Sequence, residues 1–178
     1  MQFNNVGEIF AALDKARDAF KKTVSGLSVE QSNLRENGQG WTIAEIAEHV
    51  GIVLSGISLI TGKFLPRAES ESIKFDGNFS PPISFAEHIR SLQDSKLEAP
   101  ERVHPQGRQT VSESLTKMDE SLASLVKLRP RLEAADASNV KFPHPFLGDL
   151  NLYEWLILAG LHEWRHLRQI ERILAENV

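Results

Sequence analysis

The chain has 178 residues, a length that suits a single core able to fold without covalent cross-links, so we expect residues 1–178 to form one domain. It contains no cysteine, which excludes disulfides, thiolate metal sites and a cysteine nucleophile, and any metal must be held by His, Asp or Glu. The net charge is -4 with acidic and basic residues interspersed, so there is no basic stripe for phosphates and we expect no nucleic acid partner.

The first residues carry no sign of a targeting segment. Residues 1–5 lack the basic region and the apolar run of a signal peptide. No stretch reaches the length of about 18 apolar residues that crosses a membrane. We therefore expect a cytoplasmic protein with no membrane partner.

Capping motifs mark the starts of four long helices. In each motif a polar residue stands three positions before a Glu, and the two side chains satisfy free amides at a helix N-terminus. The four pairs are Asn5 with Glu8, Thr42 with Glu45, Thr110 with Glu113, and Asn151 with Glu154. Apolar residues recur every three or four positions after each pair, which is typical of amphipathic helices.

Glycine and proline predict where these helices end. Gly26 ends the first helix. The second helix should run from Ile43 to about Phe64, because Pro66 disfavours helix at the residue before it. Pro130 should break or kink the third helix, since it removes a backbone donor.

The segments between the helices are turn-rich. Residues 66–109 contain five prolines and predict a long loop with one short helix inside it, from Phe85 to about Leu97. Residues 141–149 are a second turn-rich segment, and no segment alternates with the period of a strand. The expected fold is all-α: a four-helix bundle with long connecting loops and a short extra helix between helices 2 and 3.

Two histidines lie four residues apart on the last predicted helix. His162 and His166 therefore share one face, where both rings can bind the same metal ion. That face is apolar and should point into the core, since the pair belongs to the stripe Leu152, Trp155, Leu156, Ala159, His162, His166, Ile170 and Ile173. A buried imidazole needs partners for its ring nitrogens, which either a metal or hydrogen bonds to neighbouring helices can supply.

A third histidine should also face the core. His49 lies on the inward stripe of the second long helix, together with Ile46 and Val53. His88 and His104 lie in the loop-rich segment, and nothing pairs with them at metal-ligand spacing. We therefore expect neither of these two to bind a metal.

Three segments carry a family resemblance. Residues 41–49 read Trp-Thr-Ile-Ala-Glu-Ile-Ala-Glu-His, residues 98–108 form a loop with a Pro-Glu-Arg-Val run, and residues 144–170 join His-Pro-Phe-Leu-Gly to the histidine pair. They resemble motifs of the DinB-like (DinB/YfiT-related) family of metal-binding four-helix bundles. The resemblance implies one divalent metal ion held by His49, His162 and His166, usually with water in the fourth position. Zinc and nickel are the first candidates for the ion.

The resemblance also implies a kind of chemistry, because characterised relatives include thiol S-transferases that use bacillithiol, mycothiol or glutathione. Three imidazoles with one open position are typical of a catalytic zinc site, and such a metal activates a bound thiol or water. We expect a metal-dependent thiol S-transferase or hydrolase acting on a small-molecule substrate, with a homodimer as its assembly. A non-catalytic metal-stabilised bundle, or a module that binds a partner, is the alternative. No catalytic side chain is assigned.

Residues 162–166 also match the H-E-x-x-H motif of zinc metalloproteases. In those enzymes the Glu is the general base, and a third ligand lies downstream. Only residues 167–178 follow the motif here, Arg172 occupies the place that a metzincin ligand needs, and no edge strand is expected. The protease interpretation is therefore disfavoured.

Four charged residues near the histidines are candidates for supporting roles. Glu163 lies about 100° around the helix from His162, so we expect it to face solvent or to support a ligand. Glu45 is a further candidate acceptor for an imidazole N–H, besides its capping role. Arg165 and Arg168 can meet substrate carboxylates, although helix arginines are more often solvated.

Overall fold

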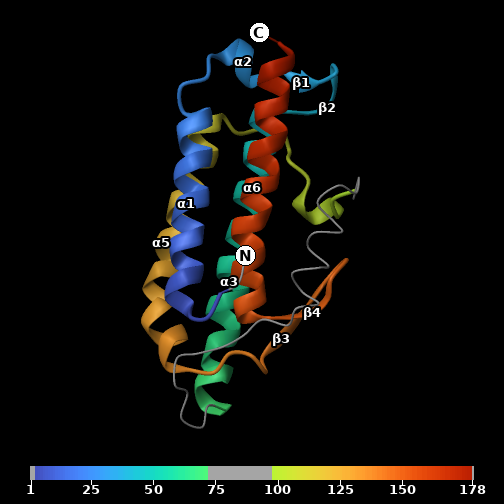
Figure 1. The fold of residues 1–178 in the computed structure, drawn as a ribbon. Helices are drawn as coiled ribbons and strands as arrows, with labels where there is room; N and C mark the ends of the chain where they lie inside the picture. The colour runs from blue at the N-terminus through green and yellow to red at the C-terminus, as the bar shows by residue number, and fades with distance from the viewer. Residues whose placement is uncertain (1–2, 72–97, 178) are drawn as a thin grey trace.

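The computed structural model describes residues 3–71 and 98–177. Four long helices form a bundle, as the sequence predicted (Figure 1). They are α1 (Val6–Val24), α3 (Ile43–Glu71), α5 (Val111–Ala134) and α6 (Leu152–Glu176). Two short helical pieces are α2 (Val29–Ser32) and the 3-10 turn η1 (Glu101–Val103). The predicted helix at 85–97 and His88 lie outside the described residues.

The predicted capping motifs start all four long helices. Asn151 Oδ1 accepts the Glu154 N–H at 3.0 Å, and Glu154 Oε2 accepts the Asn151 N–H at 2.8 Å. The same reciprocal bonds join Thr42 with Glu45 and Thr110 with Glu113. At α1 the Asn5 side chain accepts the Glu8 N–H at 2.9 Å. These local contacts fix where each helix begins.

The bundle contains two pairs of parallel neighbours. Leu13 and Arg17 of α1 lie beside Gly160 and Glu163 of α6, so these two helices run in the same direction. In α3 and α5, Gly51 lies beside Ser114 and Glu69 binds Arg131, so these helices also run together. The connection between α3 and α5 therefore starts at one end of the bundle and rejoins at the other (Figure 1). Its described part, with η1, lies on the side of α6 away from α1 (Figure 1).

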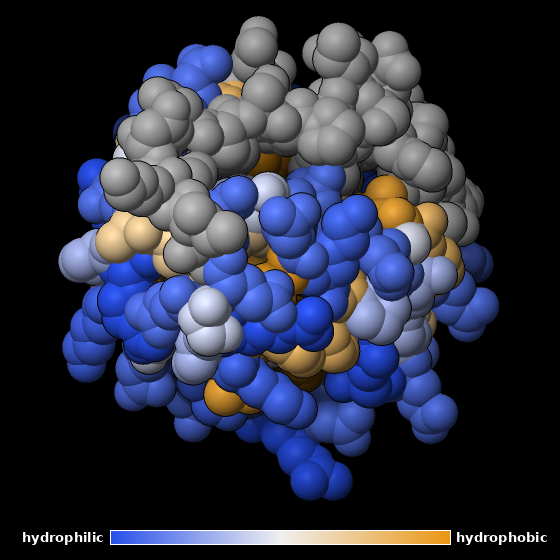
Figure 2. Space-filling view, turned by 90° about the horizontal axis from the view of Figure 1, so that it is seen from below, coloured by the Kyte–Doolittle hydropathy of each residue, from blue (hydrophilic) through white to orange (hydrophobic). Residues whose placement is uncertain are grey.

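The inward faces of the four helices make one core. Fully buried side chains come from every long helix, for example Phe10, Ile57, Met118 and Leu156. The end of the bundle seen in Figure 2 is mostly hydrophilic, with small hydrophobic areas between polar side chains. All four long helices thus contribute to one shared apolar core.

Helix α3 is long and apolar enough to cross a membrane by length and composition, the one described helix of which this is true. The sequence analysis found no such stretch, because glycines and polar residues interrupt the apolar run. Within the bundle, 56% of the most apolar window of α3 is buried, as it packs on both α5 and α6. A core helix meets the same criterion, so the signal for a membrane span is weak.

The predicted end of α3 at Phe64 is wrong. The helix continues through Pro66 to Glu71, because Leu65 and Ala68 are fully buried and tertiary packing outweighs the lost backbone bond. Helix α5 likewise runs through Pro130 to Ala134 without a break, with Leu132 buried.

Two antiparallel hairpins were also missed by the sequence analysis. β1 (Arg35–Glu36) pairs with β2 (Gln39–Thr42), and β3 (Lys141–His144) pairs with β4 (Gly148–Asn151). Strands of two to four residues are too short to show a period, but Asn37-Gly38, with both φ angles positive, is a favoured hairpin turn. Each hairpin leads directly into a long helix, α3 or α6.

Candidate metal centre

The structure brings His49, His162 and His166 together. His49 comes from α3 and the other two come from α6, and one ring nitrogen from each lies within 4.8 Å of the others. Nε2 of His49 is 3.2 Å from Nε2 of His162. Two imidazoles on a tetrahedral zinc ion have nitrogens about 3.3 Å apart, because each Zn–N bond is about 2.0–2.1 Å. Within residues 3–71 and 98–177 no other His, Asp and Glu side chains form such a group.

Hydrogen bonds orient two of the three rings. Nδ1 of His49 donates to the main-chain oxygen of Val103 at 2.7 Å, and Nδ1 of His166 donates to Oε1 of Gln169 at 2.9 Å. A carbonyl oxygen can only accept, so His49 carries its proton on Nδ1 and Nε2 keeps a free lone pair. Such support is typical of metal-binding histidines.

Burial keeps the three imidazoles neutral. His49 and His166 are 3% and 8% exposed, and His162 is half-buried. Desolvation is the main cause that lowers the pKa of each ring. The pKa of His49 is lowered, that of His162 is well below its usual value, and that of His166 is about 3. The nearby positive charge of Arg165 lowers all three pKa values further. Neutral imidazole is the form that binds a metal.

Trp41 packs between the rings of His49 and His104. The Trp41 ring lies tilted against the His49 ring, with centroids 4.8 Å apart, and His104 meets Trp41 edge-on at 5.7 Å. Nε2 of His104 donates to the Ala99 carbonyl at 2.6 Å. His104 is therefore half-buried and bound within its own segment, and it does not join the three-histidine cluster, as expected.

His144, at the end of β3, is a histidine whose position the sequence analysis did not foresee. Its Nδ1 accepts the N–H groups of Phe146 and Leu147 at 3.2 and 3.3 Å, and its ring packs on Trp155 of α6. Burial, followed by the charge of Arg102, lowers its pKa to about 4. The neutral ring therefore carries its proton on Nε2. The His-Pro-Phe-Leu-Gly run, which begins at His144, was the sequence signal that could have drawn attention to this histidine.

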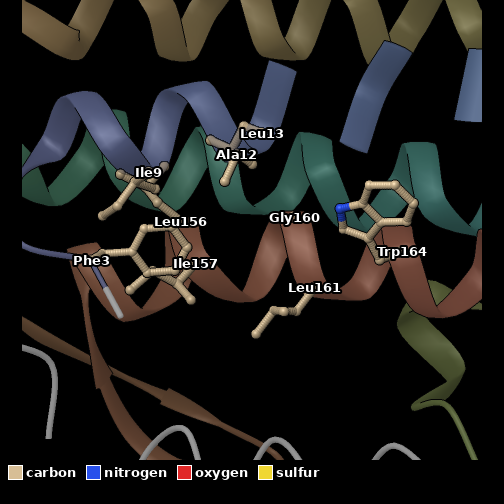
Figure 3. Close-up of a pocket in the computed structure, with 9 residues that line it drawn as sticks. All are labelled: Phe3, Ile9, Ala12, Leu13, Leu156, Ile157, Gly160, Leu161 and Trp164. Atoms are coloured by element: carbon tan, nitrogen blue, oxygen red, sulfur yellow. The ribbon is translucent and has the colours of Figure 1, made fainter. Parts of the chain in front are cut away.

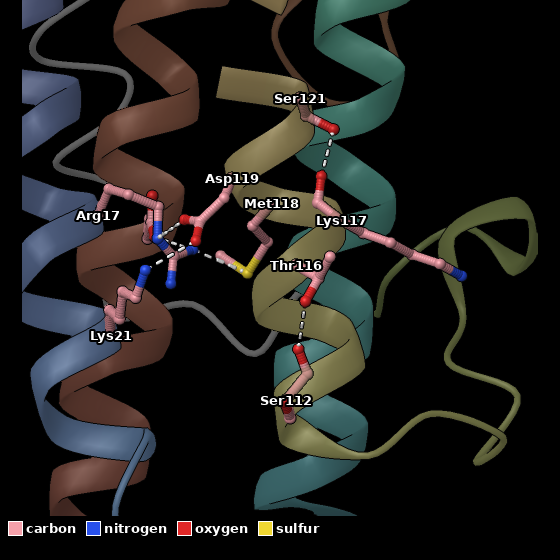
Figure 4. Close-up of polar contacts among 9 residues, drawn as sticks. Arg17, Lys21, Ser112, Thr116, Lys117, Met118, Asp119 and Ser121 are labelled. Carbon is pink, nitrogen blue, oxygen red and sulfur yellow. Dashed lines mark hydrogen bonds and ion pairs between the residues drawn. The ribbon is translucent and has the colours of Figure 1, made fainter. Parts of the chain in front are cut away.

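Glu163 does not face solvent, so that part of the prediction is wrong. It is 3% exposed and faces α1, where its Oε1 lies 2.7 Å from Nη1 of Arg17. Arg17 also approaches Asp119 and the sulfur of Met118 on α5 (Figure 4). Burial raises the pKa of Glu163 to about 7, although Arg17 acts to lower it. Glu163 is thus held behind the ligand face rather than beside the metal position.

Of the other charged candidates, only Arg165 lies near the rings. Glu45 accepts the Thr42 N–H at 2.7 Å and forms an ion pair with Arg35 at 3.3 Å, so its carboxylate is engaged at the start of α3. Its neighbour one turn on, Glu48, is the buried carboxylate that contacts the η1 segment. Arg165 is half-buried near the histidines, and Arg168 is exposed.

A small apolar pocket lies elsewhere, between α1 and α6 (Figure 3). The empty space in and around it is about 250 Å³ and includes open solvent, so it is not an enclosed cavity. Its lining is Phe3, Ile9, Ala12, Leu13, Leu156, Ile157, Gly160, Leu161 and Trp164. With no titratable side chain in this lining, the pocket offers no group for acid, base or metal chemistry.

Comparison with known proteins shows the family and supports the fold. The sequence model of the DinB superfamily matches residues 12–170. The chain belongs to the DinB superfamily. It is 29% identical to the YuaE protein of Bacillus subtilis (strain 168) over 160 residues, which is 84% of this chain and 87% of YuaE. The crystal structure of TT2238, a four-helix bundle protein, covers 93% of this chain and 96% of its own with a TM-score of 0.56, and its 23% identity supports the shared fold alone.

Proposed function

We propose that this DinB superfamily protein binds one divalent metal ion through His49, His162 and His166 and uses it to activate a small thiol or water. The observation that carries the proposal is the convergence of three neutral ring nitrogens from two helices, one of them fixed by a main-chain carbonyl. Three imidazole ligands leave a fourth position open, as in catalytic sites. When bound, such a metal makes a thiol or water nucleophilic at neutral pH.

The residues around the cluster fit an anionic ligand in the open position. Arg165 adds positive charge beside all three histidines, which favours a thiolate over a neutral thiol. Trp41 packs against the His49 ring with centroids 4.8 Å apart, which adds an apolar contact beside the cluster. We therefore propose, more specifically, a thiol S-transferase that uses zinc or nickel. A metal-dependent hydrolase is the second candidate.

The buried position of Glu163 argues against a metalloprotease. A general base must reach the water or substrate at the metal. Here the carboxylate is paired with Arg17 in the core, on the face of α6 that meets α1. The H-E-x-x-H sequence therefore has a different side-chain arrangement here from the one in metalloproteases.

Metal-reconstituted turnover tests the proposal. The protein is stripped with a chelator, reloaded with zinc, nickel or no metal, and mixed with glutathione, bacillithiol or mycothiol and a generic electrophile. We expect metal-dependent conjugation that is lost in His162→Ala. Metal binding without turnover of any thiol, or of a panel of esters and amides, would instead support the non-catalytic alternative.

A further inference from the structure

Two adjacent residues of α3 hold the segment that carries η1. Nδ1 of His49 donates to the Val103 carbonyl at 2.7 Å. The carboxylate of Glu48, 2% exposed, accepts the Gly107 N–H at 2.9 Å and the Gln109 Nε2 donor at 3.3 Å. The backbone is thus fixed on both sides of a short run, residues 103–107, directly against the cluster.

The turn at Gly107 has a backbone conformation that favours glycine. Its φ of +65° lies in the left-handed region, where a side chain is strained. A Cβ atom there would meet Oε1 of Glu45 at 3.5 Å, an ordinary van der Waals distance, so the strain of a substitution comes from the backbone angle. Since only three residues, 104–106, separate Val103 from Gly107, the anchor at Gly107 limits where the Val103 carbonyl can lie.

We propose that Glu48 is a positioning residue for the metal centre, acting through Gly107 to hold the Val103 carbonyl on Nδ1 of His49. That bond fixes the His49 tautomer and ring orientation, so Nε2 points to the position between the three rings. The inference rests on the proposed metal site. It assigns to that site a residue that binds no metal itself and that no metal-binding motif marks.

Metal affinity of defined variants measures this role. Loss of an outer hydrogen-bond partner of a metal ligand typically costs about 10–100-fold in affinity. Glu48→Ala removes both acceptors, so we expect its dissociation constant for zinc, measured by chelator competition at fixed pH, to rise by about 10–100-fold. Glu48→Gln keeps an oxygen for the Gly107 N–H, and the Gln109 amide can turn to match it, so affinity should stay within a few-fold of wild type.

Two further variants separate positioning from general damage. Glu45→Ala removes a carboxylate one turn earlier on α3, with its capping bond, but leaves the segment attached; its thermal stability should fall while its zinc affinity stays near wild type. Gly107→Ala perturbs the same anchor from the other side and should weaken zinc binding. The visible spectrum of bound cobalt should change in Glu48→Ala and Gly107→Ala and not in Glu45→Ala.

The outcomes distinguish this inference from the proposed function. A wild-type protein that binds neither zinc nor cobalt would overturn both. A wild-type protein that binds them, together with a folded Glu48→Ala of equal affinity and unchanged cobalt spectrum, would overturn the positioning role and leave the metal site standing. If Glu48→Ala fails to fold, equal affinity in Gly107→Ala decides against the role in the same way.

Discussion

Replacing Arg17 with Met should destabilise the protein strongly at alkaline pH. The Arg17 and Glu163 side chains are 4% and 3% exposed, with 2.7 Å between Nη1 and Oε1. Burial lowers the pKa of Arg17 and raises that of Glu163 to about 7, so each partner needs the other to stay charged. Removing one partner of a buried pair costs about 3–5 kcal/mol, and we expect that loss of unfolding free energy where Glu163 is ionised.

The pH dependence of this loss follows from the Glu163 carboxyl. Its pKa is raised from 4.5 to about 7 on folding, so the folded chain binds the extra proton in that window and stability falls as pH rises through it. Without Arg17 the pKa of Glu163 in the folded protein rises further, so the pH range over which stability falls extends upward. The difference between Arg17→Met and wild type should therefore be small and constant below about pH 7 and grow by up to about 1.4 kcal/mol per pH unit above it.

Urea unfolding of the metal-free proteins at about pH 5, 7 and 9 provides the assay. Histidine titration cancels in the difference, because both proteins keep every histidine. The double variant Arg17→Met/Glu163→Gln removes both charges and should recover at least half of the loss at the highest pH. A single variant that loses under about 1 kcal/mol there, or a double variant no more stable than the single, would refute this account of the buried pair.

Three further predictions follow from single features of the structure. Gly56→Ala should raise the free energy of unfolding by about 0.5–1 kcal/mol, since an added Cβ meets nothing within 4 Å in mid-helix; a lowered melting temperature would contradict this. Metal affinity should persist at about pH 6.5 and weaken as pH falls further, because burial lowers the pKa of His49, His162 and His166; titrations that already weaken tenfold between about pH 8 and 7 would contradict this. Chelation should leave the far-ultraviolet dichroism of the helices intact, and a collapse to coil would show that the metal is structural.

Signals confined to a few neighbouring residues were readable from the sequence. Each capping pair, such as Thr42 with Glu45, acts within one turn, so the start of every long helix was predicted correctly. The apolar stripes placed His49 and His166 inward, where they are buried. Helix ends were less predictable, because burial of Leu65 and Ala68 carries α3 past Pro66 against local preference.

Contacts between segments that are distant in the sequence could not be predicted from local sequence patterns. The Val103 carbonyl that orients His49 is a main-chain group, so no residue type marks it. The pairing of Arg17 with Glu163 had one usable signal: Arg17 stands four residues after Leu13 and three before Phe20, on the apolar stripe of α1. A charged residue at such a position requires a buried partner.

Metal analysis of three proteins tests the central claim most directly. Wild type, His49→Ala and Glu163→Gln are loaded with zinc, freed of excess ion and analysed for zinc per chain, with dichroism to confirm folding. The three-histidine centre predicts one ion per chain in wild type and in Glu163→Gln, and a severe loss in His49→Ala, because His49 supplies a ligand from α3 while Glu163 is held by Arg17. Full zinc occupancy in a folded His49→Ala protein would contradict the claim.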